Sequence, residues 1–487
     1  MAIPITRHWQ TDGLISTAFK KKKGLHLSAT HKATSRTSTL DAILPNSLVS
    51  LLAVGAGFGV ASIYYSQPIL SLLAVAMHAS DRVIASIPTV TQLGYALGIL
   101  FLIPLGDKYD RRVMILTKAA ILTLALTLCG LANGIGFLLL ASLLVGISAT
   151  LAQDIVPAAA HLAPASSRGS VVGTVMMGLL LGILLSRVAS GLVAARYGWR
   201  SVYGAAAIAV AIFALLAWRR LPHFEATTQL SYRSLLVSMQ HLWKQHSALR
   251  QAAIAQGLLS MGFSAFWTTL ALMLHHNFDL GSSVAGAFGL AGAAGSIAAP
   301  LAGRLADRRG PALVARLGCA VATVSFAAMG TSPLFSLKTQ LILLALVAVG
   351  FDFGVQAALV AHQTIVFGIA PEARSRANAL LFTCMFLGMA AGSTLGGMAL
   401  ARWGWMGVTV FATTTSASAL LVRLAWSNSA KSQGSSDTHS TSDAQGEDMQ
   451  SGCATFGYHC RASLISPQNS LLPNPQFPES GDAGQLL

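Results

Sequence analysis

The sequence predicts an all-α membrane protein whose twelve transmembrane helices form two pseudo-symmetric six-helix bundles. Three observations lead to this prediction. Of the 487 residues, 54% are hydrophobic and only 10% are charged, whereas soluble globular proteins carry about 25% charged residues. The apolar residues gather in separate runs that are long enough to cross a bilayer. One of these runs occurs twice, at corresponding positions of the two halves.

The repeated run covers residues 168–199 and 374–405, which match when one is shifted by 206 positions. Both copies begin with Arg and end with Gly-Trp. Small residues recur at four-residue spacing, as Gly178, Gly182, Ser186 and Ser190 in the first copy and Cys384, Gly388, Gly392 and Gly396 in the second. Such a row lets two helices approach closely within lipid. An internal repeat of this kind is typical of transporters built from two like bundles.

The order of polar and apolar segments along the chain predicts the domain organisation. Residues 1–46 are basic and lack the apolar core of a signal peptide, which predicts a disordered cytoplasmic arm. The N-terminal bundle, 47–218, contains the apolar runs 47–76, 83–104, 113–131, 135–157, 168–195 and 199–218. The C-terminal bundle, 251–426, contains the runs 251–275, 283–303, 311–331, 339–364, 374–400 and 405–426.

Two polar segments flank the second bundle. Residues 219–250 form a predicted cytoplasmic linker, in which Leu235, Met239 and Leu242 share one face of an amphipathic helix. Residues 427–487 are rich in Ser, Gln, Asp, Gly and Pro and are predicted to be disordered, because they cannot bury enough apolar surface to fold.

The basic residues predict the orientation. With both termini inside, most of the 32 Lys and Arg residues fall on the inner side, including Lys118, which we count with the basic residues around the loop between the second and third runs. The basic residues that fall on the outer side are Arg82, Arg196, Arg200, Lys338 and Arg402. By the positive-inside rule, both termini are cytoplasmic and the protein crosses the plasma membrane, here a bacterial inner membrane.

Other classes of protein fit the sequence poorly. The net charge of +15 is spread between apolar runs rather than on one face, which argues against nucleic-acid binding. Five cysteines imply no disulfide framework, and we expect no cofactor and no metal site. The sequence lacks a Gly-x-Ser-x-Gly motif, a P-loop and a His-Glu-x-x-His motif, so we expect no enzyme. A non-transporting membrane sensor remains a remote alternative, and we expect a monomer.

Two loops carry related charges, one between the second and third runs and one between the eighth and ninth. An acidic side chain at a helix end can pair with neighbouring Arg residues and with a helix N-terminus, and so form a gate that closes in one state. A tight turn that carries inner-side charge is the alternative. The predicted gating residues are Asp107, Lys108, Arg111, Arg112, Gly303, Asp307 and Arg308.

The second loop resembles the signature loop of the major facilitator superfamily, Gly-x-Leu-Ala-Asp-Arg-x-Gly-Arg-Arg, at Gly303, Leu305, Ala306, Asp307 and Arg308. The first loop matches at its Asp, Lys and Arg residues, but has Ile103 and Asp110 where the pattern has Gly.

Three further segments resemble drug and sugar efflux members that use proton antiport. They are 64–68, 178–182 with Arg187, and 352–356 with Gln363. Ser142 stands where such members carry an Arg, and Leu179 stands where they carry a Pro. The resemblance implies alternating access that exports a small organic solute, such as a drug, sugar or metabolite, in exchange for protons. Proton-coupled uptake by the same fold is the alternative.

Charged residues within the apolar runs mark the predicted site, because exposing them to lipid is costly. Asp352 lies about 20 Å along its run from Lys338 at 1.5 Å per residue, near mid-membrane, and is the predicted proton carrier or solute contact. A structural hydrogen bond is the alternative. Asp154, near the inner end of the fourth run, and Arg187, which could snorkel to the outer surface, complete the proton-coupling set.

Polar and aromatic side chains at mid-depth need a partner or water, so we expect them to face an interior cavity, with helix packing as the alternative. The predicted cavity residues are Tyr65, Gln67, Gln92, Tyr95, Trp267, Gln356 and Gln363. The expected partners are therefore a small-molecule solute, protons and the lipid bilayer.

Overall fold

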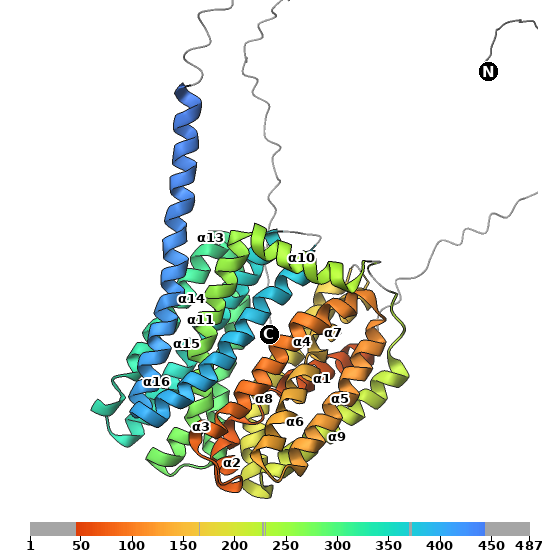
Figure 1. The fold of residues 1–487 in the computed structure, drawn as a ribbon, viewed down its shortest axis with the longest axis vertical. Helices are drawn as coiled ribbons and strands as arrows, with labels where there is room; N and C mark the ends of the chain where they lie inside the picture. The colour runs from red at the N-terminus through yellow and green to blue at the C-terminus, as the bar shows by residue number, and fades with distance from the viewer. Residues whose placement is uncertain (1–44, 165, 226–227, 229, 370–372, 444–487) are drawn as a thin grey trace, which may run out of the picture. The chain divides into compact units, whose positions relative to one another are not determined.

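The structure, a computed structural model, describes residues 45–164, 166–225, 228, 230–369 and 373–443 (Figure 1). The predicted basic arm, except for its last two residues, and the tail beyond Asp443 lie outside these residues. The described residues form helices and no strands, and nine of their helices are long and apolar enough to cross a membrane. This confirms the predicted all-α membrane fold. The count of twelve spans stays a prediction, because some predicted runs are broken into shorter helices and two are merged.

The first half of the chain contains ten helical elements. They are α1 (Asn46–Ala61), η1 (Gln67–Ile69), α2 (Leu70–Ala76), α3 (Asp81–Ile84), α4 (Ser86–Lys108), α5 (Arg111–Leu131), α6 (Ile135–Ala149), α7 (Leu151–Leu162), α8 (Arg168–Tyr197) and α9 (Trp199–Arg220). The first predicted run is broken between α1 and η1. Pro68, which lacks a backbone N–H, stands in η1, and the Ser62 hydroxyl donates to the Phe58 carbonyl at 2.8 Å.

The second half continues with nine elements. They are α10 (Tyr232–Gln245), α11 (Ser247–Phe278), α12 (Ser282–Ala287), η2 (Phe288–Gly292), α13 (Ala293–Arg309), α14 (Pro311–Met329), η3 (Ser332–Leu334), α15 (Leu337–Ile369) and α16 (Arg374–Asp443). Helix α16 joins the last two predicted runs across Gly404, whose φ is 62°. It also extends past Trp426, where we predicted disorder to begin. No proline interrupts residues 427–443. A second structural unit begins at Leu421, and the site described below lies before it.

Helix α10 occupies the predicted linker and runs across the ends of other helices (Figure 1). Its Leu235, Met239 and Leu242 side chains are buried, as an amphipathic helix requires. The Tyr232 hydroxyl donates to the Phe101 carbonyl of α4 at 3.0 Å. Its location on the cytoplasmic side stays a prediction.

The two copies of the repeated run pack in the same way. A β-carbon built on Gly182 of α8 would lie 2.3 Å from the Gly57 carbonyl oxygen of α1. One built on Gly388 of α16 would lie 2.1 Å from the Gly257 carbonyl oxygen of α11. Only glycine permits these approaches, since a real β-carbon cannot come so close to a backbone oxygen. The repeat therefore places α8 against α1 and α16 against α11.

The ends of the two copies also match. Gly198 and Gly404 both have positive φ angles, 82° and 62°, in a region that L-residues with side chains rarely adopt. In each copy the next residue is Trp, which begins the following helix in the first copy. Each glycine therefore turns the chain from one membrane helix into the next.

We predict that Gly182→Ala destabilises the protein by about 1–3 kcal/mol, because the new methyl group meets the α1 backbone. Gly173→Ala is the matched control, since Gly173 also lies on α8 but has no atom within 4 Å of a built β-carbon. Thermal unfolding of the purified protein in detergent measures both. Equal melting temperatures for the two variants would contradict the packing described here.

Candidate substrate and proton site

A cavity of about 140 Å³ lies among the membrane helices. Residues from α1, α4, α7, α8, α11, α15 and α16, and from the segments around Tyr64 and Gly292, line it. Both of these segments interrupt helices, and broken membrane helices often form binding sites in transporters.

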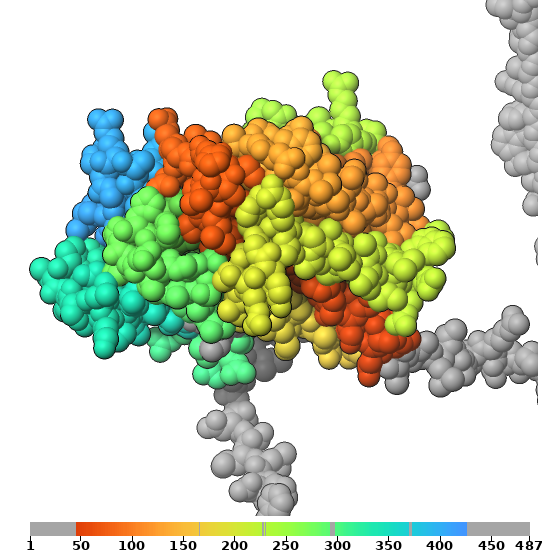
Figure 2. Space-filling model, turned by 90° about the horizontal axis from the view of Figure 1, so that it is seen from below, coloured from red at the N-terminus to blue at the C-terminus, as the bar shows by residue number. Residues whose placement is uncertain are grey.

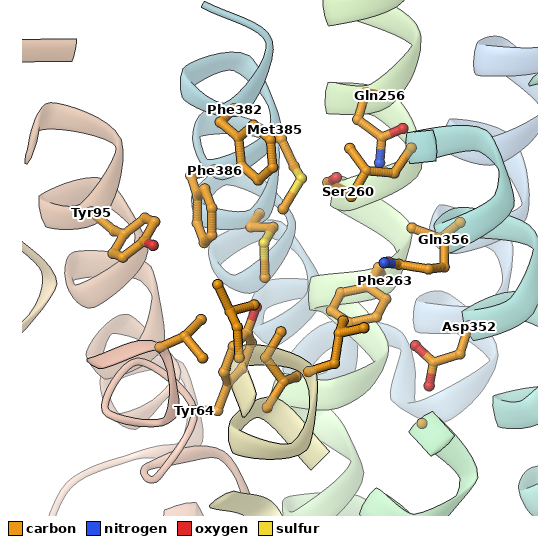
Figure 3. A pocket seen from close by; sticks show the side chains of 18 of the residues that line it. Tyr64, Tyr95, Gln256, Ser260, Phe263, Asp352, Gln356, Phe382, Met385 and Phe386 are labelled. Carbon is orange, nitrogen blue, oxygen red and sulfur yellow. The ribbon is translucent and has the colours of Figure 1, made fainter. Parts of the chain in front are cut away.

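The polar residues of the cavity follow helical spacing. On α15, Gln356 follows Asp352 by four residues and Gln363 follows Gln356 by seven, so the three residues share one face of the helix. On α11, Gln256 and Ser260 do the same. Figure 3 shows Gln256 near one end of the cavity and Asp352 near the other. The cavity is thus polar along one side and ends at an acidic group.

Arg187 of α8 is buried, with only 2% of its surface exposed. Its Nε donates to the Gln67 Oε1 at 3.0 Å. The guanidinium carbon lies 4.1 Å from the ring centre of Trp267 and 4.8 Å from that of Tyr64, which are cation–π distances. Snorkelling to the outer surface, which we considered from sequence, is therefore wrong. The partners hold this cation inside the protein.

Asp352 faces Arg187 across a gap at Gly292. A β-carbon built on Gly292 would lie 3.3 Å from the Asp352 Oδ2 and 3.6 Å from the Arg187 Nη1. Both charged side chains therefore border the same small space, although Asp352 comes from α15 and Arg187 from α8. Glycine at this position leaves the gap open. The assignment of these residues to proton coupling stays a prediction.

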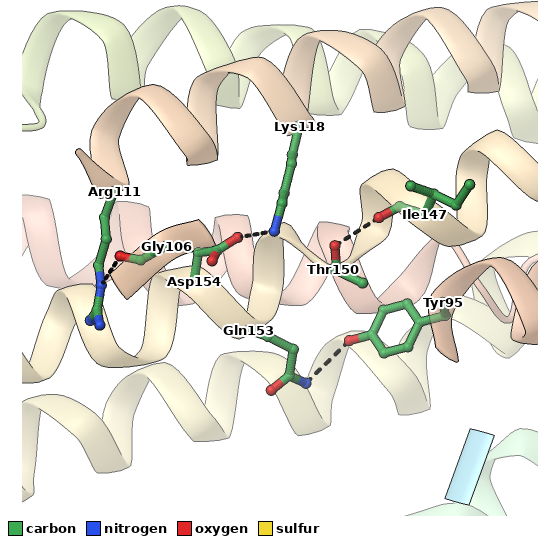
Figure 4. Close-up of polar contacts among 8 residues, drawn as sticks. All are labelled: Tyr95, Gly106, Arg111, Lys118, Ile147, Thr150, Gln153 and Asp154. Carbon is green, nitrogen blue, oxygen red and sulfur yellow. Dashed lines mark hydrogen bonds and ion pairs between the residues drawn. The ribbon is translucent and has the colours of Figure 1, made fainter. Parts of the chain in front are cut away.

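Asp154 of α7 lies apart from the cavity and forms a buried ion pair (Figure 4). Its Oδ2 is 2.5 Å from the Lys118 Nζ of α5, and both residues are 3% exposed. We counted Lys118 with the inner-side charges around the loop before α5, but its side chain is buried and pairs with a carboxylate among the helices. Gly106 of α4 makes room for this carboxylate, since a β-carbon there would lie 2.9 Å from the Asp154 Oδ1.

The residue next to Asp154 connects this ion pair to the cavity. The Gln153 Nε2 donates to the Tyr95 hydroxyl at 3.1 Å, and both residues line the cavity (Figure 4). The Tyr95 ring lies 4.3 Å from the Phe386 ring of α16. The Lys118–Asp154 pair therefore sets the rotation of α7 that brings Gln153 to Tyr95.

The remaining predicted cavity residues fall into different places. Gln67 and Trp267 contact Arg187 beside a small void of about 10 Å³. Gln92 accepts a hydrogen bond from the Ser264 hydroxyl at 3.1 Å and so connects α4 to α11. Tyr65 lines a separate groove between α1 and α8. These four residues therefore do not line the main cavity of the structure, because depth in the membrane does not specify which way a side chain points. Their role in solute binding stays a prediction.

The first predicted gating loop is held by local contacts. The Arg111 Nη2 lies 2.9 Å from the Asp107 Oδ1, and Arg111 Nε donates to the Gly106 carbonyl. Arg112 donates to the Trp218 carbonyl at 2.6 Å, and the Lys108 ammonium lies 5.5 Å from the Tyr109 ring centre. The second loop ends α13, where Gly303 is half-buried and Asp307 and Arg308 are exposed. A gating role for either loop stays a prediction.

Asp110, where the family pattern has Gly, caps α5 and joins the loop to the segment after α9. Its Oδ1 accepts from the Arg112 N–H at 2.8 Å and the Phe224 N–H at 3.1 Å, and its Oδ2 lies 2.7 Å from the His223 Nδ1. Partial burial raises the pKa of Asp110, but these hydrogen bonds outweigh it and leave the pKa below its ordinary value. The departure from the pattern thus has a structural role.

Several residues of the site were not predicted from sequence. They are Tyr64, Lys118, Gln153, Gln256, Ser260, Phe263, Phe382, Met385 and Phe386. The spacing of Gln256 and Ser260 on one face of an apolar run was a signal that could have found them. The aromatic and Met residues gave no such signal, because most apolar side chains in a membrane helix face lipid or other helices.

An internal repeat, broken helices and a polar cavity between membrane helices are typical of membrane carriers. The family model described as "Major Facilitator Superfamily" matches residues 50–359. The chain is a member of this family, and it is a multi-pass membrane transporter.

Similar proteins are also named as transporters. The chain is 36% identical over 380 residues to the "Uncharacterized transporter YgaY" of Escherichia coli O157:H7, covering 78% of this chain and 95% of the relative. It is 35% identical over 361 residues to the "Probable transporter SCO4007" of Streptomyces coelicolor, covering 74% and 82%. Among solved structures, a D-xylose–proton symporter shares the fold, with a TM-score of 0.61, 15% identity and coverage of 77% and 97%.

We predict that Lys118→Met destabilises the protein by about 3–5 kcal/mol, because it leaves the Asp154 carboxylate buried without its partner. Asp154→Asn added to Lys118→Met should recover part of this loss, since no buried charge then remains. Thermal unfolding of the two single variants and the double variant completes a double-mutant cycle. Additive effects would show that the pair does not interact.

Proposed function

We propose that this protein exports a small organic solute in exchange for protons, and that Asp352 binds the proton. The observation that carries the proposal is the cavity in which Asp352 and Arg187 face each other from α15 and α8. Protonation of the carboxylate removes its attraction to the guanidinium. That change in attraction between two helices is a means to bias a two-state carrier.

Export is supported by two further relatives. The "Multidrug resistance protein MdtG" of Citrobacter koseri is 26% identical over 215 residues, and the "Probable sugar efflux transporter" of Helicobacter pylori is 23% identical over 310 residues. Their names refer to those proteins. They agree with the resemblance of the segments around Tyr64, Gly178 and Asp352 to efflux members.

Cotransport of the solute with protons is the second candidate, and one observation favours it. Arg187 is the cation opposite Asp352, so a solute that binds Arg187 takes away the charge that stabilises the Asp352 carboxylate. The carboxylate then favours a proton, and solute and proton bind together. The inward proton gradient would in that case drive uptake.

Contacts between the halves support alternating access. At the end where α2 and α3 lie, the Thr89 and Thr394 hydroxyl oxygens are 3.0 Å apart, and the Ser282 hydroxyl donates to the Gly191 carbonyl at 3.1 Å. Figure 2 shows this end, where the yellow segment after α8 lies beside the green segment of α12. With both termini in the cytoplasm, this end faces outside, so these contacts hold the two halves together on the outer side.

The remaining parts of the proposal, on oligomeric state, membrane and gating, rest on the sequence analysis. The protein works as a monomer in the plasma membrane, a bacterial inner membrane, with its termini in the cytoplasm. The loops at Asp107 and Asp307 lie at the cytoplasmic ends of their helices and form the inner gate.

We predict that Asp352→Asn abolishes proton-coupled transport, because the amide cannot take up a proton. Inverted membrane vesicles with a pH-sensitive dye measure proton movement on addition of candidate solutes. Asp279→Asn is the matched control, since Asp279 is exposed and its left-handed backbone suits Asn. Unchanged proton movement in Asp352→Asn would remove Asp352 from the mechanism. The sign of the proton movement separates export from cotransport.

We predict that Thr89→Cys with Thr394→Cys forms a disulfide that stops transport, because it locks the outer end. The two hydroxyl oxygens lie 3.0 Å apart, within reach of disulfide geometry. Each single Cys variant is the control, and transport should return on reduction. Full transport by the oxidised double variant would show that this end need not open.

A further inference from the structure

We infer that the solute is a small carboxylate with an apolar body, bound through its carboxylate group by Arg187. The inference deepens the proposed function and rests on the chain being a carrier. It depends neither on the direction of transport nor on proton coupling.

The first argument is the state of the Arg187 guanidinium. It is buried, and its Nη2 has no hydrogen-bond partner. No ion pair found among the described residues includes it, so no acid neutralises it directly. The nearest acid described, Asp352, lies across the Gly292 gap and makes no direct ion pair with Arg187. A buried cation that lacks a direct ionic partner is costly. A guanidinium presents a planar fork of N–H groups, which matches the two oxygens of a carboxylate.

The second argument is the presence of unused donors beside Arg187 and in the cavity wall. Because the Arg187 Nε can only donate, the Gln67 oxygen must face it, and the Gln67 amide nitrogen is left without a partner. The Gln256 oxygen lies 2.9 Å from the His362 Nδ1, a contact whose donor depends on the histidine tautomer, and the Gln256 amide nitrogen has no partner. Both amides are almost fully buried. A site with spare N–H groups suits a ligand that accepts hydrogen bonds rather than one that donates them.

The third argument is the apolar part of the wall. The cavity is bordered by Phe382, Met385 and Phe386 of α16, and by Phe263 of α11, which lies beside Gln356 and Asp352 (Figure 3). The volume of about 140 Å³ holds a solute of roughly ten non-hydrogen atoms, at about one atom per water-sized sphere. The body of the solute is therefore compact and apolar.

Asp352 is the acidic residue among those that line the cavity. When ionised, it repels an anion at Arg187 across the Gly292 gap; when protonated, it adds one more O–H donor. A carboxylate solute bound to Arg187 therefore favours a protonated Asp352, which fits the cotransport candidate rather than the exchange of solute for protons. The binding test below does not depend on which of the two holds.

The experiment compares three probes of one shape and different charge: benzoate, benzamide and benzamidinium. Equilibrium binding is measured on the full chain in lipid nanodiscs, where no proton gradient exists. We expect benzoate to bind about tenfold or more tighter than benzamide, the gain of a charge-assisted hydrogen bond, with benzamidinium the weakest. Hexanoate and hexanamide repeat the comparison with an aliphatic body.

Substitutions on α8 test whether Arg187 causes the preference for benzoate. Arg187→Gln should reduce benzoate binding to the level of benzamide and leave benzamide binding unchanged, which a misfolded protein would not do. Arg187→Lys keeps the charge but loses the fork, and should give an intermediate preference. Arg196→Gln, an exposed Arg of the same helix, is the matched control and should bind as the unaltered chain does.

Equal or tighter binding of the amides or of benzamidinium overturns the inference, and so does the absence of benzoate and hexanoate binding. A benzoate preference that survives in Arg187→Gln overturns the role of Arg187. Because the assay needs no proton gradient, a failure of proton coupling leaves its result intact. Proton-coupled transport of a cationic or neutral solute would uphold the proposed function and defeat this inference alone.

Discussion

The close contact of backbones between α8 and α1, and between α16 and α11, is the constraint on which the rest of the structure depends. In lipid, helices gain little from burying apolar side chains against each other, so their association relies on close packing. Gly182 and Gly388 allow that packing, because a side chain at either position would overlap a carbonyl oxygen of the neighbouring helix. These two helix pairs set the positions of Arg187 on α8 and of the Phe and Met residues on α16.

The second constraint is the burial of charge. The protein meets it in two ways: Lys118 and Asp154 neutralise each other directly, whereas Arg187 is held by an amide and aromatic rings. A direct ion pair in the membrane is a structural element, since separating its charges is costly. A cation held by neutral groups keeps capacity for a further partner. This difference is why the cavity with Arg187, and not the Lys118–Asp154 pair, is the site of the proposed chemistry.

Much of the fold followed from the sequence, but less of the site did. Long apolar runs predict helices, and the repeated Gly positions predict which helices approach closely. The breaks before Gln67 and at Gly292 were missed, because short polar or Gly-containing stretches occur within many continuous membrane helices. Among the site residues, Asp352, Arg187, Tyr95, Gln356 and Gln363 were predicted and line one cavity. Tyr65, Gln67, Gln92 and Trp267 do not line it, whereas Tyr64, beside Tyr65, does.

By itself, the sequence determined that the chain is a helical membrane protein with an internal repeat. Hydrophobicity and residue spacing carry that information, because they reflect the thickness of the bilayer and the period of the helix. Only the tertiary structure decided which charges meet. Lys118 and Asp154, or Arg187 and Gly292, are far apart in the chain and come together only through the packing of whole helices. The rotation of each helix, which decides whether a polar side chain faces a cavity, a neighbour or lipid, is likewise a property of that packing.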